Sequence, residues 1–547
     1  MNKIGIAESI SVEFKSDKQC ISDNGIIDAI VAFANTDGGE LYIGVEDNGE
    51  ITGLHKKHEN ASKLAAFIAN KTVPPVPVRV EKITLGGTYI RITVPKSFSV
   101  VASSNGKIQR RRLKTDGTPE NIPMYPYEIS SRLSSLGLLD YSAQAVPDAD
   151  YSDLDPLERE RLRSIIKNYR GEYELLDLDD LDLDKALNLV IKQEGKYVPT
   201  FCGLLLIGKT EAIKKHMPTS ESSIQIMSGS DIKVNQNFYG SIISSFEKIN
   251  EYFMAWNKSE EMEVGLFRYT IPDYDPRAFR EALVNAFCHR DYSILGRVLI
   301  QINNDGMTIS NPGGFIEGIT ADNLLDAIPQ GRNPLLATAL KRIGLAERTG
   351  RGIDRIYEGS LLYGRLLPDY SRSSAKNVIL FIPKGPTDKE FIKMISSEQE
   401  KTGNTLPIYS LLILNHLKGV PKSQIKEIAT SLKLSESSVR VTIESLVAAG
   451  IVEAVGQSRG RYYMLSSKYY RKANDTIRYV RHKDIDPIRY EELVLELART
   501  KGDIRRADVM ELLHINGAQA YRILKKLEDS GKILQKGKGA GVKYYLT

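Results

Sequence analysis

The sequence predicts an α+β protein of several domains, because 547 residues exceed the roughly 100–200 residues of one ordinary domain. Helical and strand patterns follow one another through most of the chain, and its last part repeats one helical pattern twice. We expect an α/β domain over residues 1–135, an acidic helical linker over 136–195, a second α/β domain over 196–390, and two helix-turn-helix domains over 404–470 and 485–547.

The first domain mixes one helix with several strands. Residues 25–35 have helical spacing, and the segments ELYIGVED, PVRVEKITLGG and TYIRITVPKS show strand patterns between Gly, Pro and Asn breaks. The pair Gly38 and Gly39 is expected to form a turn before the first of these strands.

The linker and the second α/β domain carry their own signals. In the acidic stretch 145–184, ERERLRSIIKNY indicates a charged helix, and we interpret the whole stretch as a connecting segment. The run VPTFCGLLLIGK predicts a buried strand or short helix. Further on, RAFREALVNAFCHRDY has helical spacing, and RVLIQINNDGMTISNPGGF predicts a hairpin with an Asn-Asp-Gly turn and a following glycine pair.

Charge is concentrated at the C-terminal end. The chain has 74 Lys or Arg and 69 Asp or Glu, a formal charge of +5. From Asn404 onward there are 25 basic and 15 acidic residues, a local charge of +10. A basic tail favours a surface that neutralises phosphates.

Cysteine content and hydropathy narrow the class of protein. The residues Cys20, Cys202 and Cys288 lie far apart, without a CxxC pair or histidine at ligand spacing. Neither a disulfide framework nor a zinc site is therefore expected. The sequence shows no signal peptide and no run of the roughly 18 apolar residues that a membrane span needs, so we expect a cytoplasmic protein without a membrane partner.

The repeat at the C-terminal end has the order of a winged helix-turn-helix: three helices and then a hairpin with basic residues at its tip. The second helix of the helix-turn-helix, which is the third helix of each repeat, lies in the DNA major groove. The wing contacts the neighbouring DNA backbone. The alternative is that these units dock other proteins and that the basic hairpin tips are merely solvated. The residues expected to contact DNA are Arg440, Gln519, Arg522, Lys525 and Lys526 on the helices, and Arg459, Arg461, Lys536 and Lys538 on the wings.

The segments ESISVEFK and AIVAFANTDGGELYIGVEDNGEITG resemble the AlbA-type domain of the Schlafen family, over most of residues 8–130. The resemblance implies a nucleic-acid-handling domain, which in some animal Schlafens is a metal-dependent ribonuclease. It also implies a carboxylate site made of Glu8, Glu13 and either Glu46 or Asp47, in which Glu8, Glu13 and Asp47 would bind the metal.

Elementary chemistry agrees with that implication. Clustered carboxylate oxygens suit Mg²⁺ or Mn²⁺, which can activate water at a phosphodiester. Two residues after Glu13, Lys15 would point to the same side of a strand and could neutralise the phosphate. A solvated strand with the same alternation is the alternative, and many bacterial relatives are described only as DNA-binding regulators. The run Arg110, Arg111 and Arg112 suits phosphate contact, or is a solvated charge run.

A helix face predicts a nucleotide site in the second α/β domain. Glu281, Asn285 and His289 are spaced four apart and share one face. This helix is similar to the N-box helix of the gyrase, Hsp, histidine-kinase and MutL (GHKL) ATP-binding fold, in its RecG-like version. The resemblance implies that the glutamate polarises water and that the asparagine binds Mg²⁺.

Two glycine-rich segments follow in the expected order. In the first, Asn311 replaces the aspartate that usually binds adenine, ahead of Gly313 and Gly314. The second, with Gly350 and Gly352, resembles a phosphate-binding glycine box. The sequence contains no Walker motif.

These features favour a bacterial DNA-binding transcriptional regulator that binds ATP, as a possible weak ATPase, and transmits that state to the winged helices. The rival hypothesis is a Schlafen-like nuclease acting on RNA or DNA, in antiviral defence against phage, and a weaker one is a protein-docking scaffold. The expected partners are DNA or RNA, a nucleotide with Mg²⁺ or Mn²⁺, and further copies of the chain in a dimer or higher oligomer.

Overall fold

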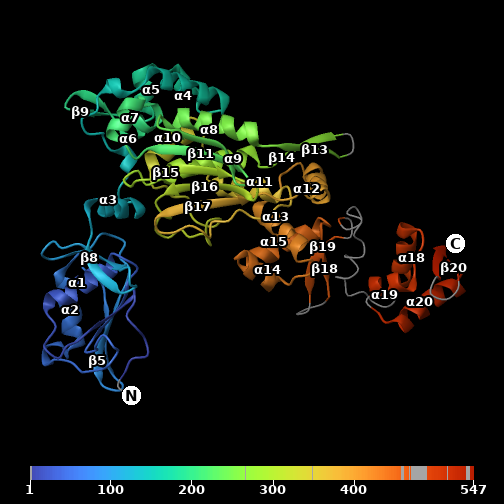
Figure 1. The fold of residues 1–547 in the computed structure, drawn as a ribbon, viewed down its shortest axis with the longest axis horizontal. Helices are drawn as coiled ribbons and strands as arrows, with labels where there is room; N and C mark the ends of the chain where they lie inside the picture. The colour runs from blue at the N-terminus through green and yellow to red at the C-terminus, as the bar shows by residue number, and fades with distance from the viewer. Residues whose placement is uncertain are drawn as a thin grey trace.

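A computed structural model describes residues 3–264, 267–347, 349–456, 461–466, 469, 490–513, 515–537 and 542–547. Figure 1 shows the successive units along the chain, from blue at the N-terminus to red at the C-terminus. Within the described residues, no helix combines the length and the apolar character needed to cross a membrane.

The N-terminal unit is built on a four-stranded sheet with the order β1-β2-β5-β4. Strand β1 runs parallel to β2, and the other neighbours are antiparallel. Apolar side chains on α1 fill one face of the sheet, and eight of the twelve residues of α1 are buried. The elements are β1 (Val12–Lys15), α1 (Asp23–Ala34), β2 (Gly39–Ile43), η1 (Lys56–His58), α2 (Ala61–Lys71), β3 (Thr72–Val73), β4 (Arg79–Thr84), β5 (Thr88–Val94), β6 (Ala102–Ser103), β7 (Gln109–Leu113), β8 (Pro119–Pro123) and α3 (Pro126–Ser135).

The predicted helix and three strands of this unit are confirmed as α1, β2, β4 and β5. The turn before β2 depends on glycine. Gly38 has φ +74°, and a Cβ there would lie 2.6 Å from the Val94 carbonyl oxygen. An L side chain therefore meets both a strained backbone and a collision at this position.

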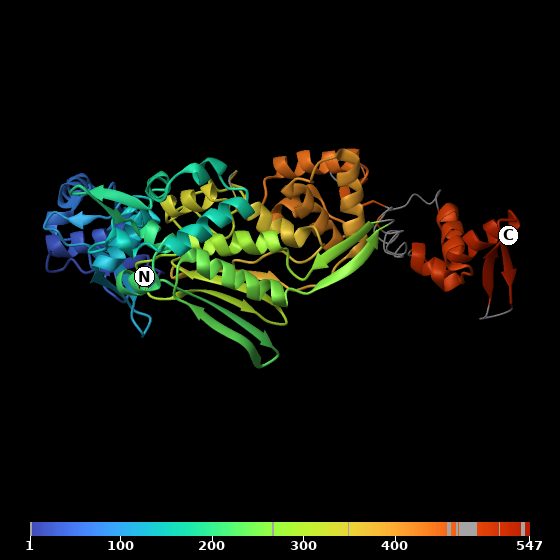
Figure 2. The same cartoon turned by 90° about the horizontal axis from the view of Figure 1, so that it is seen from above.

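The middle unit contains a five-stranded sheet with the order β12-β11-β15-β16-β17. Only the β11–β15 pair in this sheet is parallel. Helices α8 and α9 pack against each other and against its strands (Figure 2). The elements are α6 (Phe201–Ile207), α7 (Thr210–His216), β11 (Glu221–Ser228), β12 (Asp231–Phe238), α8 (Ile242–Trp256), β13 (Ser259–Val264), β14 (Phe267–Pro272), α9 (Pro276–His289), β15 (Arg297–Ile302), β16 (Gly306–Pro312), α10 (Pro334–Arg342), α11 (Gly352–Leu361) and β17 (Asn377–Pro383).

The acidic segment differs from the predicted connector. Its charged helix is present, but Leu162, Ile165 and Leu183 are buried in the same core as the middle unit. Apolar residues recur every three or four positions along this helix and form its buried face. The elements are η2 (Tyr141–Ala143), η3 (Tyr151–Asp153), α4 (Pro156–Asn168), η4 (Tyr173–Asp177), α5 (Asp180–Ala186), β9 (Val190–Gln193) and β10 (Lys196–Pro199).

Two units at the C-terminal end each contain three helices followed by an antiparallel strand pair. C-terminal unit 1 follows α12 (Lys389–Thr402) and comprises α13 (Ile408–Gly419), α14 (Ile425–Leu432), α15 (Glu436–Ala448), β18 (Val452–Val455) and β19 (Tyr462–Leu465). C-terminal unit 2 comprises α18 (Tyr490–Lys501), α19 (Arg506–Leu513), α20 (Gly517–Asp529), β20 (Ile533–Lys536) and β21 (Lys543–Leu546). Apolar residues at helical spacing, such as Val439, Ile443 and Leu446 on α15, form the buried face of each third helix.

Candidate functional site

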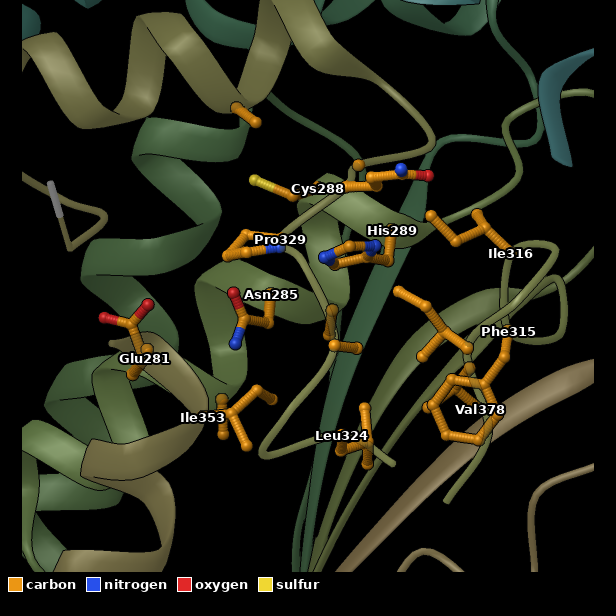
Figure 3. A pocket seen from close by; sticks show the side chains of 18 of the residues that line it. Glu281, Asn285, Cys288, His289, Phe315, Ile316, Leu324, Pro329, Ile353 and Val378 are labelled. Atoms are coloured by element: carbon orange, nitrogen blue, oxygen red, sulfur yellow. The ribbon is translucent and has the colours of Figure 1, made fainter. Parts of the chain in front are cut away.

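A cavity of about 220 Å³ lies between α9, the strands β16 and β17, α11 and the 314–331 segment. Its walls are largely apolar, with Phe315, Ile316 and Val378 among the lining residues (Figure 3). Polar side chains come from α9 and also from other elements, namely Asn311, Gln330, Lys341, Glu347 and Asp354. An apolar cavity with a few convergent polar groups is the usual form of a small-molecule site.

The predicted polar face of α9 lines this cavity. Glu281, Asn285 and His289 all contribute to its wall (Figure 3). The helix is started by the Asp275 carboxylate, which accepts hydrogen bonds from two backbone N–H groups, and by Pro276 in the first turn. The four-residue spacing therefore places three polar side chains on the inner face of an otherwise apolar helix.

Glu281 is the most perturbed of these groups. The residue is 3% exposed, and its Oε2 atom has no hydrogen-bond partner among the described residues. Burial raises the pKa of Glu281 to about 7, although the nearby Arg280 and Arg355 oppose the shift. A carboxyl that titrates near neutral pH can accept a proton from water, which is the property a general base needs.

His289 and Gly352 complete the surroundings of that helix face. Burial, followed by the charge of Arg332, lowers the pKa of His289 to about 4, so its ring is neutral at physiological pH. A Cβ on Gly352 would collide with the Glu281 carboxylate. Glycine therefore leaves room for the Glu281 side chain at the start of α11.

The first glycine-rich segment lies only partly at the cavity. Asn311 and Gly314 line it, but Gly313 is not among the lining residues. The Asn311 side-chain amide donates a 3.2 Å hydrogen bond to the Pro312 carbonyl oxygen. Gly313 instead has φ +89° and packs closely against Asp291. Glycine at this position therefore allows the backbone to approach the Asp291 side chain.

The second glycine-rich segment also lines the cavity through Gly350 and Gly352. The resemblance to a phosphate-binding glycine box predicts that its backbone amides are available to phosphate. The Glu347 carboxylate instead accepts hydrogen bonds from the N–H groups of Thr349 (2.7 Å) and Arg351 (3.0 Å). An incoming phosphate would have to compete with this carboxylate for the same donors.

The carboxylates proposed for the N-terminal unit do not gather into one ligand cluster. Groups of three His, Cys, Asp or Glu with ligand atoms within 4.8 Å occur once among the described residues, and that group contains none of the four carboxylates Glu8, Glu13, Glu46 and Asp47. Glu8 accepts a hydrogen bond from the Phe14 backbone N–H, and Glu46 accepts from two hydroxyl groups. One oxygen of each of these two carboxylates therefore accepts hydrogen bonds within the protein.

Glu13 is nevertheless an oriented, buried group. Lys15 forms a 2.7 Å ion pair with it, as expected for side chains two residues apart on one strand. The Arg111 guanidinium also pairs with Glu13, and the Asn121 amide donates to it. This arrangement leaves Glu13 neutralised by two cations.

The prediction that three consecutive arginines face nucleic acid is wrong for Arg111, which is 3% exposed. Successive side chains of β7 point to opposite faces, so the middle arginine turns inward and lies 4.4 Å above the Phe33 ring. Arg110 and Arg112 point outward, where they pair with Glu128 and Glu120.

The predicted DNA-contacting residues of the C-terminal units fall into two groups. Arg440, Arg461 and Arg522 are exposed and have no ion-pair partner among the described residues. Lys525 pairs with Glu528 and Asp529, Lys526 pairs with Glu491, Gln519 caps the N-terminus of α20, and Lys536 lies over the Tyr545 ring. Arg459 and Lys538 lie outside the described residues.

The sequence interpretation missed the 314–331 segment, which forms one wall of the cavity. Its apolar side chains, including Ile319, Leu324 and Ile328, line the cavity although the segment contains no helix or strand. The available signal was a set of apolar residues within a polar stretch between the two glycine-rich segments.

Comparisons with known families define the class of protein. Residues 8–118 match the family described as Schlafen, AlbA_2, and residues 296–381 match the one described as putative ATP-dependent DNA helicase recG C-terminal. Residues 135–223 match a domain of unknown function (DUF8451), which crosses the expected boundary at 195. The first two matches confirm the resemblances in the sequence, and together they indicate a mixed α/β, nucleic-acid-binding, ATP-dependent protein.

Among solved structures, the chain is similar to the DIP2311 protein from Corynebacterium diphtheriae. The two are 19% identical, the likeness covers 85% of this chain and 93% of that chain, and the TM-score is 0.51. This likeness concerns the fold alone. The mRNA-binding domain of elongation factor SelB from E. coli, solved in complex with SECIS RNA, is 18% identical over 25% of this chain and 96% of that chain, but the TM-score of 0.12 supports no statement about the fold.

Proposed function

We propose that this chain is a nucleic-acid-binding regulator whose middle unit binds ATP with a divalent metal. The observation that carries the proposal is the inner face of α9, where Glu281 and Asn285 project into a largely apolar cavity. The apolar walls suit the base, and the α9 face suits the phosphate end with its metal. A buried carboxylate oxygen without a hydrogen-bond partner, as Glu281 Oε2 is here, is costly unless a ligand uses it.

The donors present fit such a ligand. The Asn285 amide oxygen would serve as a ligand of Mg²⁺, a cation that prefers oxygen donors. Glu281 would take up a proton from a water molecule beside it, and the neutral His289 ring would offer a hydrogen bond without adding charge. The bound metal would supply charge neutralisation at the phosphates.

The size of the cavity indicates that a wall must move when a nucleotide enters. Ligand sites usually measure roughly 300–1,000 Å³, whereas this cavity measures about 220 Å³. The 314–331 segment is the wall without regular secondary structure, so we propose that it moves outward.

That wall contacts the units on both sides. Glu317 pairs with Lys96 of the N-terminal unit at 3.0 Å. Farther along the segment, Asp322 pairs with Lys433, and Asp326 accepts a hydrogen bond from the Tyr409 hydroxyl, both in C-terminal unit 1. A movement of the segment would therefore disturb contacts to both neighbours, which is a physical route from nucleotide to nucleic-acid affinity.

We also propose that the two C-terminal units are winged helix-turn-helix modules that bind DNA. The support is the order of three helices and a hairpin in each unit, with Arg440 and Arg522 exposed on the third helix. We propose the domain bounds 404–470 and 485–547 for these two modules, as the sequence predicts.

Salt dependence should separate DNA binding from protein docking. Arg522→Ala is expected to reduce the slope of log affinity against log salt concentration by about 0.9, because one phosphate contact is lost. Lys525→Ala should change it less, since Lys525 is already paired within its own helix. Fluorescence anisotropy with duplex DNA at several salt concentrations measures both slopes. A flat slope for the wild-type chain would favour the docking alternative.

Coupling through the 314–331 segment gives a second expected result. If ATP changes the DNA affinity of the wild-type chain, Lys433→Ala combined with Tyr409→Phe should reduce that change to less than about twofold, while ATP affinity is retained. Lys426→Ala, a substitution on α14 outside these contacts, is the matched control. Equal ATP-dependent shifts in both variants would contradict this route.

A metal-dependent nuclease is the second candidate, favoured by the ion pair between the buried Glu13 and the partly exposed Lys15. Labelled RNA and DNA incubated with Mg²⁺ or Mn²⁺, and with chelator, test it. Cleavage should require the metal and fall at least about 100-fold in Glu8→Ala and Glu13→Ala. Undiminished cleavage by these variants would exclude the carboxylate site.

A further inference from the structure

Three potential metal ligands meet in the N-terminal unit, away from the nucleotide cavity. Asp17 follows β1, Cys20 lies shortly before α1, and His58 ends η1. One oxygen, one sulfur and one ring nitrogen of these residues lie within 4.8 Å of one another. No sequence pattern indicates this group, because 38 positions separate the cysteine from the histidine.

The group is held in place by several contacts. Asp17 is fully buried and accepts hydrogen bonds from the backbone N–H groups of Ile21 (3.0 Å) and His55 (2.7 Å). The His58 Nδ1 atom lies 2.9 Å from the Asp17 carboxylate. Cys20, in turn, lies in a tight turn with φ +56°, and its N–H donates to the Asp17 carbonyl oxygen. The loop after β1 and the loop before α2 therefore converge on one point.

We propose that Asp17, Cys20 and His58 bind a zinc ion. Thiolate, imidazole and carboxylate are the three donor types of protein zinc sites, and ligand atoms around a tetrahedral zinc lie about 3.5 Å apart. The separations here allow that geometry with small side-chain movements. Mg²⁺ and Ca²⁺ are disfavoured, because sulfur and nitrogen donors do not suit hard cations.

Burial and charge around the group agree with a bound cation. Asp17 and His58 are shielded from solvent, whereas Cys20 is partly exposed and leaves a side open for entry and for a fourth ligand. The neighbouring Lys57 ammonium is paired with Asp23 at 2.7 Å, which offsets its charge. The ion would fasten the β1–α1 loop to the segment before α2, so its loss would loosen this end of the N-terminal unit.

Cobalt and zinc titrations of the full chain test the site. Reduced, chelator-stripped protein should bind one Co²⁺ per chain with a thiolate-to-cobalt absorption band, and Zn²⁺ should displace it. Cys20→Ser should abolish the band, and His58→Gln should weaken zinc binding at least about tenfold. Cys202→Ala, which removes a buried cysteine elsewhere, should leave both unchanged. Zinc should also raise the unfolding temperature of the wild-type chain more than that of Cys20→Ser.

Absence of stoichiometric cobalt or zinc binding, or equal binding by wild type, Cys20→Ser and His58→Gln, would overturn the proposal. Circular dichroism of each variant identifies a loss of binding that is due to unfolding. Because Cys20 is partly exposed and serine is nearly isosteric, Cys20→Ser keeps the test decisive if His58→Gln fails to fold. The result is independent of the nucleotide proposal, since the cavity shares no residue with this group.

Discussion

Asn285→Ala is expected to weaken magnesium-dependent ATP binding by about 30- to 150-fold. Loss of a polar contact to a charged group costs about 2 to 3 kcal/mol, which is that factor in Kd. The side chain lies in the middle of the α9 face that lines the cavity, and the helix itself is anchored by apolar residues on its other faces. The substitution should therefore affect the ligand far more than the fold.

Isothermal titration with ATP, in Mg²⁺ and in chelator, measures this effect. The variant should lose most of the difference that Mg²⁺ makes to the wild-type affinity. Asn235→Ala, an exposed asparagine on β12, is the matched control and should bind as wild type does. Two results would contradict a metal-binding role for Asn285. One is an ATP affinity of Asn285→Ala in Mg²⁺ equal to that of wild type. The other is a loss of ATP affinity in chelator as large as the loss in Mg²⁺.

Glu281→Gln is expected to stabilise the chain at high pH. The folded-state pKa of Glu281 is about 7, above the ordinary 4.5, so the fold favours the protonated carboxyl. The contribution of the protonated Glu281 carboxyl to the free energy of unfolding is fully present below about pH 4.5. This contribution is lost as the pH rises through about 7. Between about pH 5 and pH 8 the wild type should lose about 2 to 3 kcal/mol relative to the variant.

Urea unfolding at a series of pH values, followed through a probe in the middle unit, measures this difference. Glu347→Gln is the contrasting variant. Burial raises the pKa of Glu347, but hydrogen bonds from Arg351 and Thr349 outweigh this effect and lower the pKa overall. Glutamine at this position should therefore destabilise the chain at high pH. A Glu281→Gln variant whose relative stability does not change with pH would contradict the buried, ionisable state assigned to this group.

Local patterns predicted much of the fold and one face of the site. The strands β2, β4 and β5 follow from alternation, and the cavity-facing set on α9 follows from its four-residue spacing. Both signals lie within one element, where the backbone period alone fixes which side chains share a face.

Contacts between distant segments could not be predicted in the same way. The run of three arginines predicts an exposed Arg111, but strand alternation turns it toward Glu13, 98 positions away. Glu347 occupies the backbone amides of Thr349 and Arg351 just before α11, and the 314–331 segment contacts Lys96 and Lys433. Both depend on loop conformations that have no sequence period. The convergence of Cys20 with His58 belongs to the same class.

Direct titration of the wild-type chain with ATP is the measurement closest to the central claim. In Mg²⁺ we predict one nucleotide bound per chain, with weaker binding in chelator and competition by a non-hydrolysable ATP analogue. No binding at millimolar nucleotide would contradict a nucleotide site in this cavity. So would binding that is unchanged in Glu281→Gln and Asn285→Ala as well as in the control Asn235→Ala.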